Sequence, residues 1–153
     1  MFVFDTSAFI NGWKDHYPWP TFERVWEWVG EEMEAGRVIA PREVYRELEK
    51  RDDDIHAWMK ERRHLFLDPI QDVQDKAGPI YLQFPRPGVR DAADPWVIAE
   101  ADVRGFTVVT YEGRTFSGAR TKNWDRQMPG VCAVLGVPCI TLPMALNQLG
   151  RRL

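Results

Sequence analysis

The feature of this sequence that most constrains its fold is the alternation between short apolar runs and longer segments with helical spacing. Val, Ile, Phe and Thr gather in the short runs, and these residues favour strands. The predicted strands are residues 2–4, 38–40, 106–110 and 138–142. Strands that alternate with helices are joined by right-handed crossovers, so we expect an α/β fold. Its predicted form is a three-layer α/β/α arrangement with a mainly parallel central sheet.

The segments between these runs carry apolar residues at helical intervals and end at glycine or proline. The predicted helices are residues 21–36, 41–64 with a break at 52–54, 94–105, 131–135 and 143–149, with a short helix at 69–76. Residues 11–20, the rest of 65–90 and 111–127 are expected to be loops.

Length and composition indicate one compact cytoplasmic domain over residues 1–153. The chain is 44% hydrophobic, which is enough for one substantial core. No run approaches the roughly 20 apolar residues of a membrane span, so we expect no membrane association. Asp5 interrupts the apolar run that a signal peptide would require. Cys132 and Cys139 lack the spacing of a zinc clasp, and we interpret them as apolar side chains rather than redox or metal-binding groups.

Four acidic residues are placed so that the fold could bring them together. Asp5 follows the first strand, and Glu112 follows the strand at 106–110. Asp94 begins the helix before that strand, and Glu47 lies between apolar positions of the helix after residue 41. In a parallel sheet the ligand site lies beyond the carboxyl ends of the strands, where these side chains would meet.

Grouped carboxylates repel one another unless a cation lies between them. Magnesium and manganese prefer hard oxygen ligands and retain waters that can attack phosphorus. A metal centre would also change the meaning of the net charge of −3, which by itself argues against nucleic-acid binding. The residues therefore favour a Mg²⁺- or Mn²⁺-dependent hydrolase that acts on phosphodiesters.

Four segments, taken in order, resemble the motifs of the PIN domain. They are FVFDTSAFI at 2–10, EVYREL at 43–48, DPWVIAEA at 94–101 and VVTYE at 108–112. Each motif is weak alone, but their order and spacing cover almost the whole chain. The chain resembles in particular DUF4411, a PIN-like branch whose members have about this length and also end in a cysteine-containing helix and strand.

The resemblance implies a metal-dependent endoribonuclease, often the toxin component of a bacterial toxin–antitoxin pair. It implies Asp5, Glu47, Asp94 and Glu112 as catalytic and metal-binding residues, with Glu112 where the family usually has Asp. Thr6 or Ser7 would orient Asp5 or a metal-bound water, and Asp91 could compete with Asp94. RNA is the implied substrate, and a cognate antitoxin and a homodimer are implied partners.

Other interpretations stay open for the protein and for each acid. A catalytically silent PIN-like module that binds RNA or protein, or a structure-selective DNA nuclease, would share the same motifs. Asp5 and Asp94 could simply cap helices, Glu47 could be a solvated charge, and Glu112 could be a turn residue.

Three further groups could contact nucleic acid. The loop at 111–127 carries four basic residues that could hold phosphates, and a helix face after residue 41 carries four more. Three aromatic residues at 11–20 could stack on bases, although packing is the favoured interpretation. The loop set is Arg114, Arg120, Lys122 and Arg126. The helix-face set is Arg42, Arg46, Lys50 and Arg51, and the aromatic set is Trp13, Tyr17 and Trp19.

Overall fold

The protein is built on a five-stranded sheet in which all observed pairings are parallel. The computed structural model describes residues 1–51, 53–83 and 92–152. The strand order is β3-β2-β1-β4-β5. The strands are β1 (Phe2–Phe4), β2 (Val38–Pro41), β3 (Phe66–Leu67), β4 (Thr107–Val109) and β5 (Cys139–Ile140).

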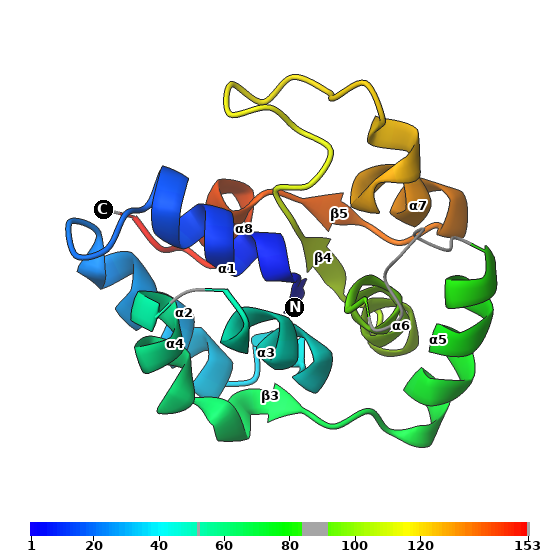
Figure 1. Ribbon diagram of the computed structural model, residues 1–153, viewed down its shortest axis with the longest axis horizontal. Coiled ribbons are helices and arrows are strands. Elements are labelled where there is room, and N and C mark those ends of the chain that lie inside the picture. Colours follow the sequence, from blue (N-terminus) through cyan, green and yellow to red (C-terminus); the bar gives the residue numbers. More distant parts are fainter. Residues whose placement is uncertain (52, 84–91, 153) are drawn as a thin grey trace.

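Helices connect successive strands and cover both faces of the sheet, so the predicted three-layer α/β/α fold is confirmed. The helices are α1 (Thr6–Asn11), α2 (Glu23–Glu34), α3 (Arg42–Glu49), α4 (Asp53–Lys60), α5 (Gln71–Gln83), α6 (Asp94–Arg104), α7 (Met128–Leu135) and α8 (Leu142–Gln148). Short turns add η1 (Gly12–His16), η2 (Arg63–Leu65) and η3 (Trp124–Arg126). In Figure 1, α1, α2 and α8 lie on one side of the sheet, and α5, α6 and α7 lie on the other. Within the described residues, no helix is long and apolar enough to cross a membrane.

The strand order places a switch point between β1 and β4. The chain first forms β1, then β2 beside β1, and then β3 beside β2. It then crosses back through α5 and α6 and forms β4 on the other side of β1. The helices that follow β1 and β4 therefore leave on opposite faces, which opens a crevice at the carboxyl ends of these two strands. Asp5 follows β1 and Thr110 follows β4, so both residues lie at this crevice.

Three predictions about the elements were wrong. Part of the expected loop at 11–20 is helical, because η1 continues directly from α1. Gly12 permits this path, since a Cβ atom there would lie only 3.1 Å from the ring of Trp26. Strand β3 was not expected, because two residues carry too little pattern to be recognised.

The third error concerns α5, which continues through Gly78 and Pro79 where a loop was expected. A proline inside a helix removes one hydrogen bond and usually kinks or ends the helix. Here the buried residues Val73, Ala77 and Ile80 recur at helical spacing. Burial of this face offsets the cost of the proline, which is itself exposed.

The aromatic residues at 11–20 pack as the favoured interpretation predicted. Trp13 is buried, stacks on Trp19 at 5.1 Å, and contacts Trp26 and Trp58. Tyr17 meets Phe22 edge to face. These rings join α2 and α4 to η1 and form part of the core on one face of the sheet.

Candidate functional site

Asp5 is held rigidly at the start of α1. It is 1% exposed and caps the helix, because its Oδ1 accepts hydrogen bonds from the Ala8 N–H and the Ser7 hydroxyl, both at 2.8 Å. Its Oδ2 accepts a hydrogen bond from the Thr110 hydroxyl at the end of β4. Asp5 therefore caps α1, as one interpretation held. It is also hydrogen-bonded to Thr110 on the other side of the switch point.

Ser7 and Thr110 extend this network to the loop after β4. Ser7 Oγ accepts from the Tyr111 N–H at 2.9 Å, and Thr110 Oγ1 accepts from the Glu112 N–H at 2.9 Å. Each hydroxyl also lies within hydrogen-bond distance of Asp5, and the two hydroxyl oxygens are 3.0 Å apart. The same two side chains thus orient Asp5 and position the backbone that carries Glu112.

The fold brings three of the predicted acids into one group. One carboxylate oxygen from each of Asp5, Asp94 and Glu112 lies within 4.8 Å of the other two. Asp94 is in the first turn of α6, one residue after the capping position, and is partly buried, as is Glu112. The carboxylate of Asp5 therefore lies close to those of Asp94 and Glu112, although about a hundred positions separate them in the sequence.

Glu47 lines the same cleft, and its carboxylate is hydrogen-bonded to two other elements of the cleft. Its Oε2 accepts from the Thr6 hydroxyl at 2.6 Å, and its Oε1 accepts from the Ala93 N–H at 2.7 Å. These contacts tie α3 to the amino ends of α1 and α6. Thr6 therefore orients Glu47, whereas Ser7 orients Asp5.

These acids line a cleft of about 320 Å³ at the carboxyl ends of β1 and β4. Two arginines, Arg51 and Arg114, also line it, and its remaining walls are mostly polar. Asn11, Tyr111, Thr121 and Gln127 are among the lining residues. The cleft combines an acidic floor with basic groups that could neutralise a bound phosphate.

Burial and repulsion make the charge on Asp5 costly. Burial raises the pKa of Asp5 to about 7, and the nearby Glu112 adds to the rise. The hydrogen bonds from Thr110, Ala8 and Ser7 act in the opposite direction without cancelling it. A cation placed among the three carboxylates would remove this penalty.

The geometry of the acids suits one small divalent cation. Magnesium–oxygen distances are about 2.0–2.1 Å, so two ligands on one ion are at most about 4.2 Å apart. Oxygens within 4.8 Å of one another need only small side-chain movements to reach this arrangement. Asp5, Asp94 and Glu112 could therefore hold Mg²⁺ or Mn²⁺, with Glu47 at the border of the same cleft.

Comparison with protein families gives a match over residues 2–153 to the family described as a domain of unknown function, DUF4411. The chain belongs to the DUF4411 family. A comparison with functionally curated proteins found no match.

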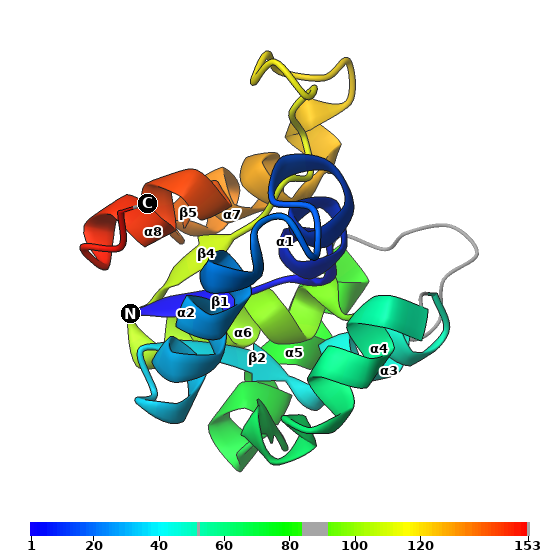
Figure 2. The same cartoon turned by 90° about the vertical axis from the view of Figure 1, so that its left-hand side faces the viewer.

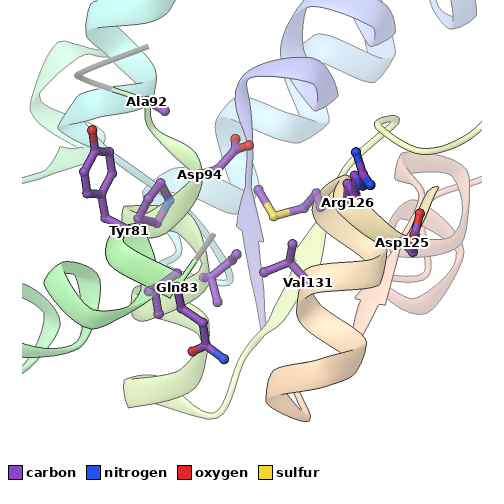
Figure 3. Close-up of a pocket in the computed structure, with 11 residues that line it drawn as sticks. Tyr81, Gln83, Ala92, Asp94, Asp125, Arg126 and Val131 are labelled. Carbon is purple, nitrogen blue, oxygen red and sulfur yellow. The ribbon is translucent and has the colours of Figure 1, made fainter. Parts of the chain in front are cut away.

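The DUF4411 chain has a second cavity beside the acidic cleft. It encloses about 290 Å³ between α6, α7 and the end of α5, with Ile98, Met128 and Val131 among its apolar walls. Figure 3 shows Asp94 and Arg126 at its rim with their charged ends pointing the same way. Asp94 lines both cavities, so the acidic cleft and the apolar cavity adjoin at this residue.

The four predicted basic residues of the loop have different surroundings. Arg114 lines the acidic cleft and Arg126 lines the apolar cavity. Arg120 lies 3.9 Å over the ring of Trp124, and Lys122 is exposed. In the helix-face set, Arg51 reaches the acidic cleft, whereas Arg42 pairs with Asp68 at 2.7 Å. Arg46 and Lys50 line a separate groove, of about 830 Å³, that also contains Glu47.

Asp91, the predicted competitor of Asp94, lies outside the described residues. Thr110 is the site residue that the sequence interpretation overlooked. Its position at the end of β4, opposite Asp5, was a usable signal, because the ends of neighbouring parallel strands lie side by side.

The two cysteines lie near the acidic cluster. Cys132 is buried, Cys139 is half-buried, and both are free thiols. The pKa of the Cys132 thiol is raised by its hydrogen bond with Cys139, by burial and by the nearby acids. A thiol held in its neutral form behaves as an apolar side chain with weak polarity.

Proposed function

We propose that this chain is a PIN-like, Mg²⁺- or Mn²⁺-dependent endoribonuclease. The observation that carries the proposal is the convergence of Asp5, Asp94 and Glu112 at the switch point of a parallel sheet. Buried carboxylates in a group are expensive, and Asp5 is anchored by three hydrogen bonds in spite of this cost. Such an arrangement supports a cation site better than a structural role.

Each residue has a distinct part in the proposed reaction. Asp5, Asp94 and Glu112 would hold the metal, while Ser7 and Thr110 would keep Asp5 aligned. Bound Mg²⁺ or Mn²⁺ supplies positive charge to the phosphoryl oxygens and lowers the pKa of a coordinated water.

The remaining groups of the cleft would act on the substrate. Arg51 and Arg114 would bind the phosphates that flank the scissile bond. Glu47 would hold the amino end of α6, and with it Asp94, at the correct distance from α1. Attack of water on phosphorus then breaks one P–O ester bond, and the leaving oxygen takes up a proton.

The biological setting of the proposal comes from the PIN resemblance. The resemblance implies the toxin component of a toxin–antitoxin pair, and we expect it to act in the cytoplasm. A small antitoxin protein would then cover the acidic cleft, and two copies of the chain would form a homodimer through their helices.

Cleavage of RNA by the purified protein tests the proposal. Wild-type protein should cut single-stranded RNA with Mn²⁺ or Mg²⁺ and should be inactive with a chelator. Asp5→Asn and Asp94→Asn should each lower the rate by about a hundredfold or more, because the metal contributes several kcal/mol to the transition state. The matched control is Glu49→Gln, which changes an exposed acid on α3. Equal rates in wild type and Asp5→Asn would overturn the proposal.

The same assay separates the alternatives. A structure-selective DNA nuclease would prefer flapped or single-stranded DNA to RNA. A catalytically silent module would cut neither polymer and would not bind Mn²⁺ in calorimetry, whereas Mn²⁺ binding that is lost in Asp5→Asn would favour the enzyme. Two features support the silent alternative: the half-buried Glu112, which is longer than the usual Asp, and the net charge of −3.

A further inference from the structure

Three rings form a continuous stack at the edge of the acidic cleft. His16 lies between Tyr111 and Phe116, with ring centroids 4.0 Å from Tyr111 and 4.8 Å from Phe116. The interplanar angles are 8° and 22°, so all three rings are close to parallel. The stack joins η1, which extends α1, to the loop after β4.

The stack begins at the cleft and ends in solvent. Tyr111 is a wall residue of the acidic cleft, and so is Arg114, two residues before Phe116. The loop that carries Phe116 rises away from the body of the protein above β4, as Figure 2 shows. Phe116 is 75% exposed, whereas Tyr111 and His16 are only partly accessible. One face of the Phe116 ring is therefore occupied by His16, and most of the rest of the ring is open.

The chemistry of the stack suits a flat neutral ligand. Burial lowers the pKa of His16, so its ring is neutral near pH 7 and takes part as an aromatic surface rather than as a phosphate-binding cation. Basic groups nevertheless lie in the same loop. The backbones of Arg114 and Arg120 form an antiparallel β-bridge on either side of Phe116. An aromatic platform beside basic side chains is the combination that binds single-stranded nucleic acids.

Three other described aromatic side chains, Trp13, Trp19 and Trp124, do not offer such a surface. Trp13 is buried, and the ring of Trp19 is stacked against it. Trp124 is covered by the guanidinium of Arg120. Phe116 thus combines high exposure, a stacked support and a short connection to the cleft.

We propose that the outer face of Phe116 is a stacking platform for an unpaired base of the nucleic-acid strand whose phosphate lies at the acidic cleft. The inference rests on the proposed nuclease function and makes it more specific. A base can stack on a side chain only after it leaves its duplex, so the platform selects single-stranded RNA or loops over paired RNA. Arg114, between the cleft and Phe116 in the chain, would hold the intervening backbone.

Binding can be measured apart from cleavage. Fluorescence anisotropy with a labelled ten-nucleotide adenosine RNA, in Mg²⁺ and in the Asp5→Asn background, reports affinity without hydrolysis. Phe116→Leu should weaken binding roughly tenfold, the range that loss of one stacked base produces. Phe116→Trp should bind as tightly as Phe116 or more tightly. The matched control Leu82→Ala removes another exposed apolar side chain and should leave the affinity unchanged.

A duplex of the same length provides the second comparison. Phe116→Leu should leave its weaker affinity unchanged, because paired bases present no free face. Unchanged single-strand affinity in Phe116→Leu, equal losses for both RNAs, or no measurable binding of the single strand would each overturn the inference. Stacking-dependent binding without any cleavage in the wild type would instead refute the proposed nuclease and leave the platform standing. Melting temperatures should match among the variants, since Phe116 is exposed.

Discussion

Asp5 and Glu32 are both buried carboxylates, yet the fold treats them in opposite ways. Glu32 is 2% exposed and accepts hydrogen bonds from Arg37 and from Arg151 near the carboxyl terminus. These bonds, led by that from Arg37, lower its pKa. Asp5 is equally buried, but it is bonded by a backbone N–H and two hydroxyls and faces two further acids.

The difference is one of charge compensation: the described part of the chain provides cations for the carboxylate of Glu32 but not for that of Asp5. Glu32 is compensated by two guanidinium groups, so its role is to hold α2 to the segment after α8. The burial of Asp5 raises its pKa to about 7, which shows that its own surroundings do not fully support the charge. A buried acid that is well anchored and poorly compensated is a candidate for function, whereas a compensated one belongs to the scaffold.

The largest expected effect is the loss of metal affinity as pH falls through the pKa of Asp5. A metal binds the ionised carboxylate, so below about pH 7 it competes with a proton. Mn²⁺ affinity measured by calorimetry should fall about tenfold per pH unit, or about a hundredfold from pH 7 to pH 5. Asp5→Asn should bind weakly throughout and lack this slope. If the Mn²⁺ affinity of the wild type stayed constant from pH 7 to pH 5, the raised pKa of Asp5, and with it the contrast with Glu32, would be refuted.

Stability without metal should respond in opposite directions at the two sites. The pKa of Asp5 is raised, so its contribution is favourable at low pH and is lost as pH rises from about 4 towards about 7. The pKa of Glu32 is lowered, so its contribution is present above its usual value of 4.5 and is lost as pH falls below it.

At pH 8 with a chelator, Glu32→Gln should lower the free energy of unfolding by about 2 kcal/mol, because charged hydrogen bonds are lost. Asp5→Asn should keep or increase it. Urea unfolding measures both. Glu31→Gln is the control, since this exposed acid also contacts Arg151 and should cost far less. A destabilised Asp5→Asn beside an unaffected Glu32→Gln would reverse our interpretation.

Removing one hydroxyl from the Asp5 network should have an intermediate effect. Thr110→Val deletes the hydrogen bond to Asp5 and the acceptor for the Glu112 N–H while keeping the shape of the side chain. Mn²⁺ affinity at pH 8 should fall about tenfold, as for other groups that orient metal ligands. Thr107→Val, at the start of the same strand, should leave it unchanged. Equal affinities in the two variants would show that Asp5 needs no such support.

The smallest effect is expected from a single arginine at the rim. Arg114→Gln should reduce the slope of log affinity for RNA against log salt by about one, because one phosphate contact is lost. The titration uses the Asp5→Asn background to prevent cleavage. Arg152→Gln, an exposed arginine near the carboxyl terminus, should leave the slope unchanged. A normal slope in Arg114→Gln would place the phosphates elsewhere.

Some parts of the site were predictable from local patterns. Asp5 follows an apolar run, and Asp94 starts a helix that ends at Gly105, as expected. The side-chain network was less accessible, because the hydrogen bond between Thr110 and Asp5 joins residues 105 positions apart. Glu47 illustrates the same limit: its helical position was predicted, but its contacts with Thr6 and Ala93 depend on how three helices meet.

The sequence by itself determined the alternation of strands and helices, the parallel sheet and the placement of acids at strand and helix ends. These follow from residue periodicity and turn-forming residues, which act over a few positions. Only the tertiary structure decided that Asp5, Asp94 and Glu112 share one point, that Glu32 is neutralised, and that Phe116 ends a three-ring stack. Charge compensation and ring stacking depend on distances in space between segments far apart in the chain; the pairing of β1 with β4, for example, brings the end of each strand, and so Asp5 and Thr110, side by side.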